Sequence, residues 1–247
     1  MLLIDSDNAM GSAAGDVDDG LAVAALLKSG LPMAALTSVG GNTTRDQADR
    51  NNRTLGALCG YAGPYRLAGS EPLRIVALGP LTNAATWLDQ ASEIIVVGSN
   101  VSSPGRFPPW WPHEFNLTHD RPAARAVFSS SVPLVVVPLD VARKMRVGKA
   151  ELAELYGPLG EHLRKHSKRW LRRSRLLRWS STFPVYDLPA AMYAIDPSLV
   201  EVVETTARCH PNLWIEYGKG GRTVRLVRGF DPREIWRRFV ALVNLPR

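Results

Sequence analysis

Short apolar runs alternate with longer amphipathic segments along the first half of this chain. Short apolar runs indicate buried strands, and apolar positions at helical spacing indicate helices. The expected strands are residues 2–4, 34–39, 74–78, 93–97 and 134–137. The expected helices are residues 20–28, 45–59, 83–89 and 122–129. Strands that alternate with helices predict an α/β fold with a largely parallel sheet.

The second half of the chain is less regular. Residues 151–179 are helical and basic in pattern, and residues 180–189 interrupt that pattern before a short helix at 190–195. Strand-like runs follow at 200–203 and 223–227, and then a helix at 232–243. Since no linker, repeat or low-complexity tract interrupts the sequence, we expect one domain over residues 1–247.

Polar turns follow four of the expected strands. They are Asp5-Ser6-Asp7, Gly40-Gly41-Asn42, Gly79-Pro80-Leu81-Thr82-Asn83 and Gly98-Ser99-Asn100. Ligands of such sheets bind beyond the carboxyl ends of the strands. We therefore expect these turns to share one binding rim.

Five carboxylates crowd the connection between the first strand and the first helix: Asp5, Asp7, Asp16, Asp18 and Asp19. Such a cluster repels itself unless a cation or protons neutralise it. Carboxylate and carbonyl oxygens select Ca²⁺ or Mg²⁺, and no Cys/His cluster has zinc spacing. The residue types leave a second interpretation open, in which these acids cap the helix and face solvent.

The composition is that of an ordinary globular protein, with 45% hydrophobic and 21% charged residues, which excludes disordered and collagen-like classes. No apolar run has the roughly 18 residues of a membrane span, and the first residues lack a signal-peptide pattern. Two cysteines make no disulfide framework. We therefore expect a cytoplasmic protein with no membrane partner.

The formal charge of +7 is concentrated between residues 164 and 178. That segment has three interpretations: a solvated face, a phosphate site or a nonspecific nucleic-acid contact. Nucleic acid is the least favoured partner, because the rest of the chain is near neutral. For a solvated face, the buried side would consist of Trp170, Leu171, Leu176, Leu177 and Trp179.

A series of motifs, taken in order, resembles the inosine-uridine preferring nucleoside hydrolase family. The motifs are Asp5-Ser6-Asp7 with Asp18-Asp19, Val39-Gly40-Gly41-Asn42, Leu78-Gly79-Pro80-Leu81-Thr82-Asn83, Glu114-Phe115-Asn116, Leu139-Asp140-Val141 and Tyr186-Asp187. One such motif is weak evidence, but the whole series in order spans nearly the entire chain. The resemblance implies an open, mainly parallel, doubly wound Rossmann-like sheet with helices on both faces. It also implies homodimers or homotetramers.

The resemblance further implies a Ca²⁺ ion and a reaction, the hydrolysis of the N-glycosidic bond of a nucleoside or related riboside. By position, the calcium ligands would be Asp7, Asp19, Asp187 and the carbonyl of Thr82. Asp7 would also be the general base that activates a calcium-bound water. The residues expected to bind substrate are Asp18, Asn42, Glu114, Asn116 and Tyr186.

The sequence departs from the family around the leaving base. Asp7 and Asp18 are separated by ten residues, the segment between Gly69 and Arg74 is short, and Tyr186 replaces a His. Tyr186 could donate a hydrogen bond to the base, and Trp110 and Trp111 could stack on it. Two alternatives stay open: a riboside-binding protein without activity, and a hydrolase of 5′-phosphorylated ribosides that uses residues 164–178.

Overall fold

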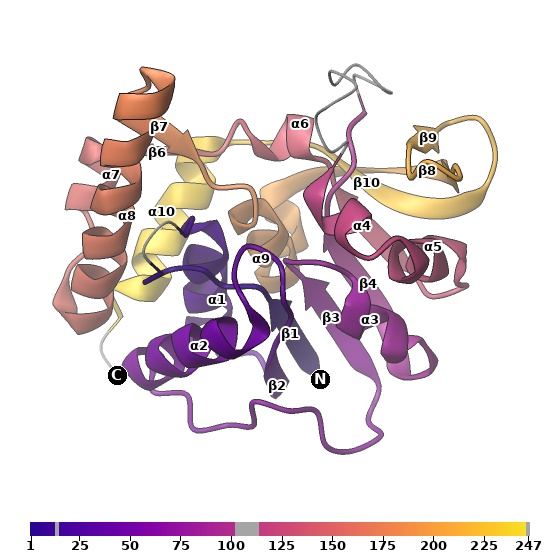
Figure 1. Cartoon of the computed structure of the whole chain (residues 1–247), viewed down its shortest axis with the longest axis horizontal. Helices are drawn as coiled ribbons and strands as arrows, with labels where there is room; N and C mark the ends of the chain where they lie inside the picture. The colour runs from indigo at the N-terminus through magenta and orange to yellow at the C-terminus, as the bar shows by residue number, and fades with distance from the viewer. Residues whose placement is uncertain (13–14, 102–113, 246–247) are drawn as a thin grey trace.

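An eight-stranded sheet forms the centre of the computed structural model, which describes residues 1–12, 15–101 and 114–245, with the backbone alone at 177–178. The strand order is β2-β1-β3-β4-β5-β10-β8-β9 (Figure 1). The bounds are β1 Leu2–Ser6, β2 Met33–Ser38, β3 Leu73–Ala77, β4 Ala91–Val97, β5 Leu134–Val137, β8 Val200–Cys209, β9 Ile215–Tyr217 and β10 Arg222–Phe230. A separate two-stranded sheet pairs β6 (Arg146–Gly148) with β7 (Thr182–Pro184).

The sheet is parallel from β2 through to β10 and antiparallel beyond it. β1 pairs with β2 and β3, β3 with β4, β4 with β5, and β5 with β10, all in parallel. β8 then pairs with β10, and β9 with β8, in antiparallel register. The mainly parallel α/β fold expected from the sequence is confirmed. The strand pattern of residues 200–203 and 223–227 continues in the structure into a longer hairpin.

Helices cover both faces of the sheet. The α-helices are α1 Asp18–Lys28, α2 Arg45–Cys59, α3 Thr82–Thr86, α4 Phe115–His119, α5 Arg121–Ser129, α6 Leu139–Ala142, α7 Lys149–Ala153, α8 Gly157–Arg178, α9 Leu188–Ile195 and α10 Pro232–Val243. Two short 3₁₀ helices, η1 Leu88–Gln90 and η2 Pro197–Leu199, complete the elements. Local signals set both ends of α2: Thr44 caps its start by accepting the Gln47 N–H (3.3 Å), and Gly60 ends it with a φ of 76°.

Alternate side chains of the central strands feed two hydrophobic cores. In β1, Leu2 and Ile4 point to the core formed with α1, α9 and α10, and Leu3 points to the core formed with α3 and α5. All five residues of β1 are buried, as expected of a strand covered on both faces. The position of β1 between β2 and β3 therefore fixes Asp5 within the strand and Asp7 just after it.

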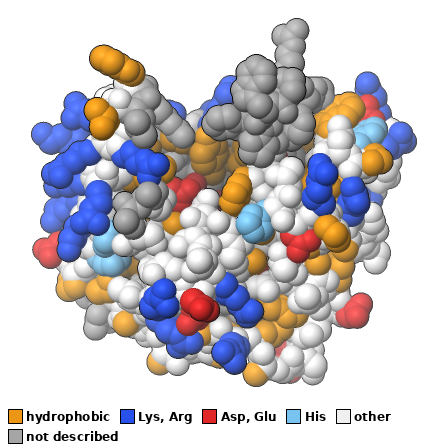
Figure 2. Space-filling model, in the orientation of Figure 1, with side chains coloured by type: hydrophobic (Ala, Val, Ile, Leu, Met, Phe, Trp, Pro, Cys, Tyr) orange, Lys and Arg blue, Asp and Glu red, His pale blue; other side chains and the backbone are white. Residues whose placement is uncertain are grey.

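The basic segment forms α8, on the outer side of the molecule, where Figure 2 shows Lys and Arg side chains gathered. Leu171 is buried, but Leu176 is 79% and Trp179 is 96% exposed. The expectation that Leu176 and Trp179 belong to a buried side is wrong, because the helix extends past the elements that cover Leu171. The side chain of Leu177 lies outside the described part.

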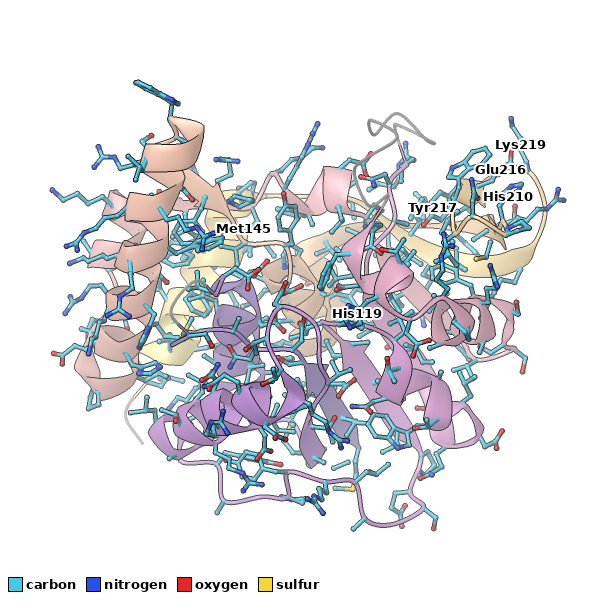
Figure 3. The ribbon with its side chains drawn as sticks, viewed as in Figure 1. His119, Met145, His210, Glu216, Tyr217 and Lys219 are labelled. Atoms are coloured by element: carbon cyan, nitrogen blue, oxygen red, sulfur yellow. The ribbon has the colours of Figure 1, made fainter. Side chains whose placement is uncertain are left out.

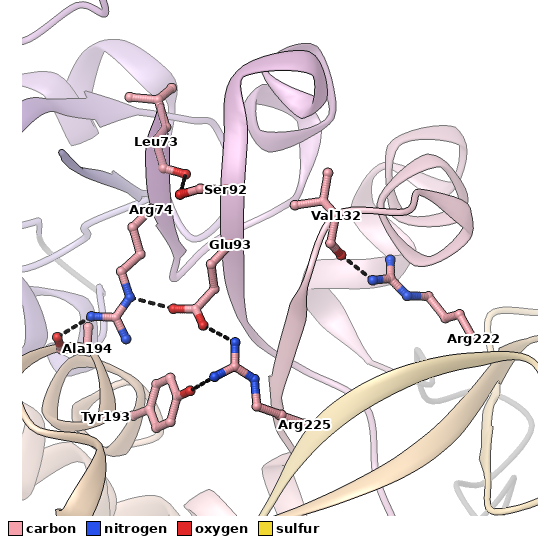
Figure 4. A network of polar contacts seen from close by, with 9 residues as sticks. All are labelled: Leu73, Arg74, Ser92, Glu93, Val132, Tyr193, Ala194, Arg222 and Arg225. Carbon is pink, nitrogen blue, oxygen red and sulfur yellow. Dashed lines mark hydrogen bonds and ion pairs between the residues drawn. The ribbon is translucent and has the colours of Figure 1, made fainter. Parts of the chain in front are cut away.

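A polar network joins the sheet to α9 beside the amino ends of β3 and β4 (Figure 4). The Glu93 carboxylate of β4 accepts hydrogen bonds from Arg74 of β3 and Arg225 of β10. Arg74 also donates to the Ala194 carbonyl (2.6 Å), and Arg225 donates to the Tyr193 hydroxyl (2.9 Å). Since Glu93 is buried, this network links segments that are distant in the sequence.

Within the ranges described above, no helix is both long and apolar enough to cross a membrane.

Candidate active site

A cavity of about 400 Å³ opens at the carboxyl edge of the parallel strands. Its lining includes most of the site residues expected from the sequence: Asp18, Asp19, Asn42, Glu114, Asn116, Tyr186 and Asp187. The sequence separates these residues widely, and the ends of β1, β2, β4 and α9 bring them together. The expectation of one shared rim agrees with this placement.

Asp7 lies directly behind this cavity. The backbone N–H of Asn42 donates to Asp7 Oδ2 (2.6 Å), while Asp7 Oδ1 is buried without a hydrogen-bond partner in the described structure. Gly41 and Gly79 make room for the carboxylate: a Cβ on Gly41 would overlap Oδ2, and one on Gly79 would lie 2.6 Å from Oδ1. Burial raises the pKa of Asp7 to about 6.

Carboxylates from the loop and from α1 gather in front of Asp7. Single carboxylate oxygens of Asp16, Asp18 and Asp19 lie within 4.8 Å of one another. Burial and the neighbouring negative charges raise the pKa of Asp19 well above its usual value. Ser6 Oγ donates to Asp19 (2.7 Å), which holds that carboxylate in place.

Asp187 reaches the same cluster from the second half of the chain. It stands immediately before α9, whose residues pack against α1. Burial, and then repulsion by Asp18 and Asp19, raise the pKa of its carboxyl well above the usual range. The structure therefore joins the two acidic motifs that the sequence analysis had placed together by resemblance.

This donor set fits a hard divalent cation. The Oδ1 atoms of Asp7 and Asp18 are buried and lack hydrogen-bond partners in the part of the chain described. Unpaired buried carboxylate oxygens are costly unless a positive charge compensates them. Since the converging groups are all oxygen donors, Ca²⁺ and Mg²⁺ suit them better than softer metals.

Leu78 is among the residues that line this cavity, and Thr82 is not. Thr82 is the first residue of α3, its side chain is exposed, and it is not among the cavity-lining residues. Leu78 follows β3 directly and lines the cavity, and its carbonyl accepts a hydrogen bond from Asn116 Nδ2 (2.9 Å). The sequence offered one indication of this placement: Leu78 is the last residue of the expected strand 74–78, and such strand ends meet at the binding edge.

Glu114 and Asn116 form the next part of the wall. The two carboxylate oxygens of Glu114 accept the N–H groups of Asn116 (3.0 Å) and Leu117 (2.6 Å) and so cap α4. Burial raises the pKa of Glu114 to about 7. Asn116 Nδ2 also donates to the Val97 carbonyl (3.1 Å), so both amide hydrogens are engaged and Oδ1 is available to a hydroxyl donor.

Aromatic side chains also border the cavity. Tyr186 lines it beside Asp187, and Phe115, which the sequence analysis had not assigned to the site, lines it with 39% of its surface exposed. Phe115 packs against His119 at the end of α4, with ring centroids 5.3 Å apart. Figure 3 labels His119. Trp110 and Trp111 lie outside the described residues.

The far wall of the cavity comes from the ends of β4 and β5. It includes Asn100, which the sequence analysis had placed on the binding rim, and Leu139, Asp140 and Arg143, to which it had given no role in the site. Asp140 accepts the Val101 N–H with both carboxylate oxygens (3.1 and 3.2 Å). Ser99 shares a hydrogen bond with Tyr217 of β9 (2.6 Å), which Figure 3 labels at the edge of the sheet. The antiparallel hairpin thus supports the turn that carries Asn100.

No described residue of the basic helix α8 lines this cavity. Arg169 and Arg173 of α8 instead border a separate cavity of about 90 Å³, together with Gly11, Ser12 and other residues of the loop before α1. The described residues of α8 therefore contact the back of that loop.

Fold and site together define an α/β protein with an acidic cleft at the carboxyl edge of its sheet. Residues 65–237 match the family model described as inosine-uridine preferring nucleoside hydrolase, and the chain belongs to this family.

Curated relatives carry related names. The chain is 30% identical over 145 residues to the pyrimidine-specific ribonucleoside hydrolase RihA of Citrobacter koseri, a match that covers 54% of this chain and 46% of the relative. It is 28% identical over 163 residues to a putative pyrimidine-specific ribonucleoside hydrolase RihB of Shigella boydii, covering 62% of this chain and 66% of the relative. The chain thus spans about half to two thirds of the length of these relatives.

Solved structures share the fold over its whole length. The plant nucleoside hydrolase PpNRh1 superposes with a TM-score of 0.82 at 19% identity and covers 99% of both chains. A purine-preferring ribonucleoside hydrolase from Gardnerella vaginalis gives a TM-score of 0.76 at 20% identity, covering 98% of this chain and 97% of that one.

Proposed function

We propose that this protein hydrolyses the N-glycosidic bond of a ribonucleoside or related riboside and releases the free base and ribose. The observation that carries the proposal is the cluster of buried carboxylates behind and around the cavity, which unites Asp7 and Asp19 with Asp187. Membership of the nucleoside hydrolase family supports the same reaction.

The cluster would hold Ca²⁺ through Asp7, Asp19, Asp187 and a backbone carbonyl, for which Leu78 replaces the expected Thr82. When bound, the ion would offset the repulsion among these carboxylates, fix the ribose diol and make a water more acidic. The raised pKa values of the Asp19 and Asp187 carboxyls apply to the cluster without the positive charge of the ion.

The neighbouring side chains would bind the sugar. Asp18, Asn42, Glu114 and Asn116 all line the cavity, and Asp18 belongs to the acidic cluster itself. A hydroxyl of ribose can donate to a carboxylate or to the amide oxygen of Asn116. These contacts would hold the anomeric carbon above the acidic cluster.

Asp7 would accept the proton of the attacking water. Its Oδ1 has no other hydrogen-bond partner in the described structure, while the Asn42 N–H holds Oδ2. As the N-glycosidic bond breaks, positive charge develops on the ribose, and the surrounding carboxylates stabilise it. Tyr186 would donate a hydrogen bond to the departing base, because its hydroxyl-bearing side chain shares the cavity.

Hydrolysis of p-nitrophenyl riboside tests the reaction, because this leaving group needs little protonation. We expect turnover with calcium, loss of turnover with a chelator, and a loss of at least about a thousandfold in Asp7→Asn. Asp46→Asn, which removes an exposed carboxylate of α2, is the matched control and should behave as wild type.

A binding measurement accompanies the assay. Calcium should raise the melting temperature of the wild type and should have a much smaller effect on Asp19→Asn. Calcium and riboside binding without turnover of any riboside would replace the hydrolase with a riboside-binding protein. Full activity of a folded Asp7→Asn variant would exclude the assigned base.

A further inference from the structure

Arg143 is a cation on the wall of an otherwise acidic cavity. The described lining contains Arg143 and the carboxylates Asp16, Asp18, Asp19, Glu114, Asp140 and Asp187. Arg143 follows α6, which begins just beyond β5, whereas the aspartate cluster follows β1. With β3 and β4 between them and strands about 4.8 Å apart, β1 and β5 are separated by about 14 Å. Arg143 therefore enters the cavity wall from the β5 side, and the aspartate cluster enters it from the β1 side.

The Arg143 guanidinium makes no hydrogen bond or ion pair with any described residue. Residues 102–113 contain no Asp or Glu, so that segment supplies no carboxylate to pair with it. Asp140, three residues earlier, directs both carboxylate oxygens to the Val101 N–H. A cation that is left unpaired on a substrate cavity is available to the substrate.

Asn100 adds a second donor on the same wall. Its side chain lines the cavity and has no hydrogen-bond partner in the part of the chain described. Guanidinium and amide N–H groups together suit a phosphate or a carboxylate, since a guanidinium can donate two parallel bonds to either anion.

We propose that Arg143 and Asn100 form a subsite for an anionic substituent on the riboside, either a phosphate on C5′ or a carboxylate on the base. This inference rests on the proposed function and names its substrate class. It assigns to the β4–β5 wall the phosphate contact that the sequence analysis had considered for residues 164–178. A ribose bound at the aspartate cluster would direct one substituent along the cavity toward Arg143.

Calorimetric binding to the calcium-loaded protein separates the two sources of the anion. Ribose 5-phosphate is compared with ribose, and orotidine, which has a carboxylate on its base, is compared with uridine. We expect one anionic member to bind at least about tenfold more tightly than its neutral counterpart. Arg143→Gln should abolish that preference and leave the affinity for the neutral ligand within about twofold.

Lys144→Gln is the matched control, because Lys144 is the adjacent basic residue, is exposed and does not line the cavity. Arg172→Gln on α8 tests the other basic surface, and both variants should keep the preference for the anion. The proposal is overturned if no anionic ligand binds more tightly than its neutral counterpart, or if Arg143→Gln keeps the preference.

The same comparison distinguishes this inference from the proposed function. An anion preference that depends on Arg143, in a protein that hydrolyses no riboside, would retain the subsite and exclude the hydrolase. Hydrolysis of neutral ribosides without any anion preference would retain the hydrolase and exclude the subsite.

Discussion

At the scale of single residues, two glycines allow Asp7 to occupy its position. Gly41 and Gly79 approach the carboxylate so closely that a methyl group on either one would contact it. The glycines and Asp7 come from three different strand ends, so this fit depends on the pairing of β1 with both β2 and β3. The orientation of the proposed base is therefore a property of its neighbours.

Gly41→Ala tests this fit. The new Cβ would overlap Asp7 Oδ2 and lie 2.9 Å from Pro80 Cδ, so the carboxylate or the turn must shift. We expect riboside turnover to fall by at least about tenfold, because small displacements of a catalytic group are costly. In Gly40→Ala the nearest atom is 3.7 Å from the new Cβ, and this control should keep its activity. Equal activity of the two variants would contradict the argument.

His166 provides a test of stability against pH. Burial, and then the charges of His162, Arg169 and Lys165, lower its pKa from the usual 6.5 to about 4. The unfolded chain therefore takes up a proton near pH 6.5, and the folded chain only near pH 4. Acid favours unfolding across this window, so the stability contributed by neutral His166 is present above pH 6.5 and is lost toward pH 4.

His166→Gln should lose less stability in acid than the wild type. Because His166 is partly exposed to solvent, we expect a difference of about 1 kcal/mol between pH 6.5 and 4.5. Urea unfolding of both calcium-loaded proteins at the two pH values measures it. Parallel pH profiles would show that His166 titrates normally in the fold.

At the scale of elements, α8 shows how a helical pattern can mislead. Its apolar residues repeat at helical spacing, but the surrounding structure covers only part of its length. Leu171 packs in the core, whereas Leu176 stands 79% exposed near the end of the helix. Periodicity indicates that a helix has an apolar face, and the neighbouring elements determine how far that face is buried.

Two leucine substitutions in α8 test this difference. Leu171→Ala should lower the free energy of unfolding by about 2–3 kcal/mol, because it removes buried methyl groups and leaves a cavity. Leu176→Ala should change it by less than about 0.5 kcal/mol, as expected at an exposed position. Chemical denaturation of the two variants gives both values. A cost at Leu176 equal to that at Leu171 would mean that a partner covers it.

At the scale of the whole molecule, the Glu93 network joins parts of the chain that fold around the same sheet. Arg74 of β3 and Arg225 of β10 both donate to the Glu93 carboxylate. Arg225 also donates to the hydroxyl of Tyr193 in α9. Arg74 and Glu93 stand near the amino ends of β3 and β4, whereas the cavity lies at the carboxyl edge of the sheet; Figure 4 shows the network. It therefore belongs to the stability of the sheet and leaves the substrate site untouched.

Glu93→Ala should lower the free energy of unfolding by about 1–2 kcal/mol, because two partly buried guanidinium groups lose their partner. The cost stays below that of a fully buried pair, since Arg74 and Arg225 are 29% and 42% exposed at their side chains. Glu204→Ala, which removes an exposed carboxylate of β8 opposite Arg225, is the control and should be near neutral. Riboside KM should be the same in both variants. A raised KM in Glu93→Ala alone would connect the network to the site.

The sequence by itself determined the repeating elements and the edge of the sheet at which polar groups meet. Residues 45–59, 134–137 and 232–243 form the helix, strand and helix that their patterns predict, because periodicity and capping act within a few residues. Parallel strands place their carboxyl ends together, so the positions of Asn42 and Asn100 directly after expected strands are enough to assign them to one rim. The assignment of Glu114 needed the resemblance to the family.

Tertiary structure alone decided which atoms meet at that rim. Leu78 rather than Thr82 lies at the cavity, Arg143 enters its wall from beyond β5, and the β8–β9 hairpin supports the turn at Ser99. The placement of Arg143 and the support from the hairpin do not follow from local spacing. Each depends on strand order and on packing between segments far apart in the sequence, and the energy of such packing is set by the whole assembled sheet.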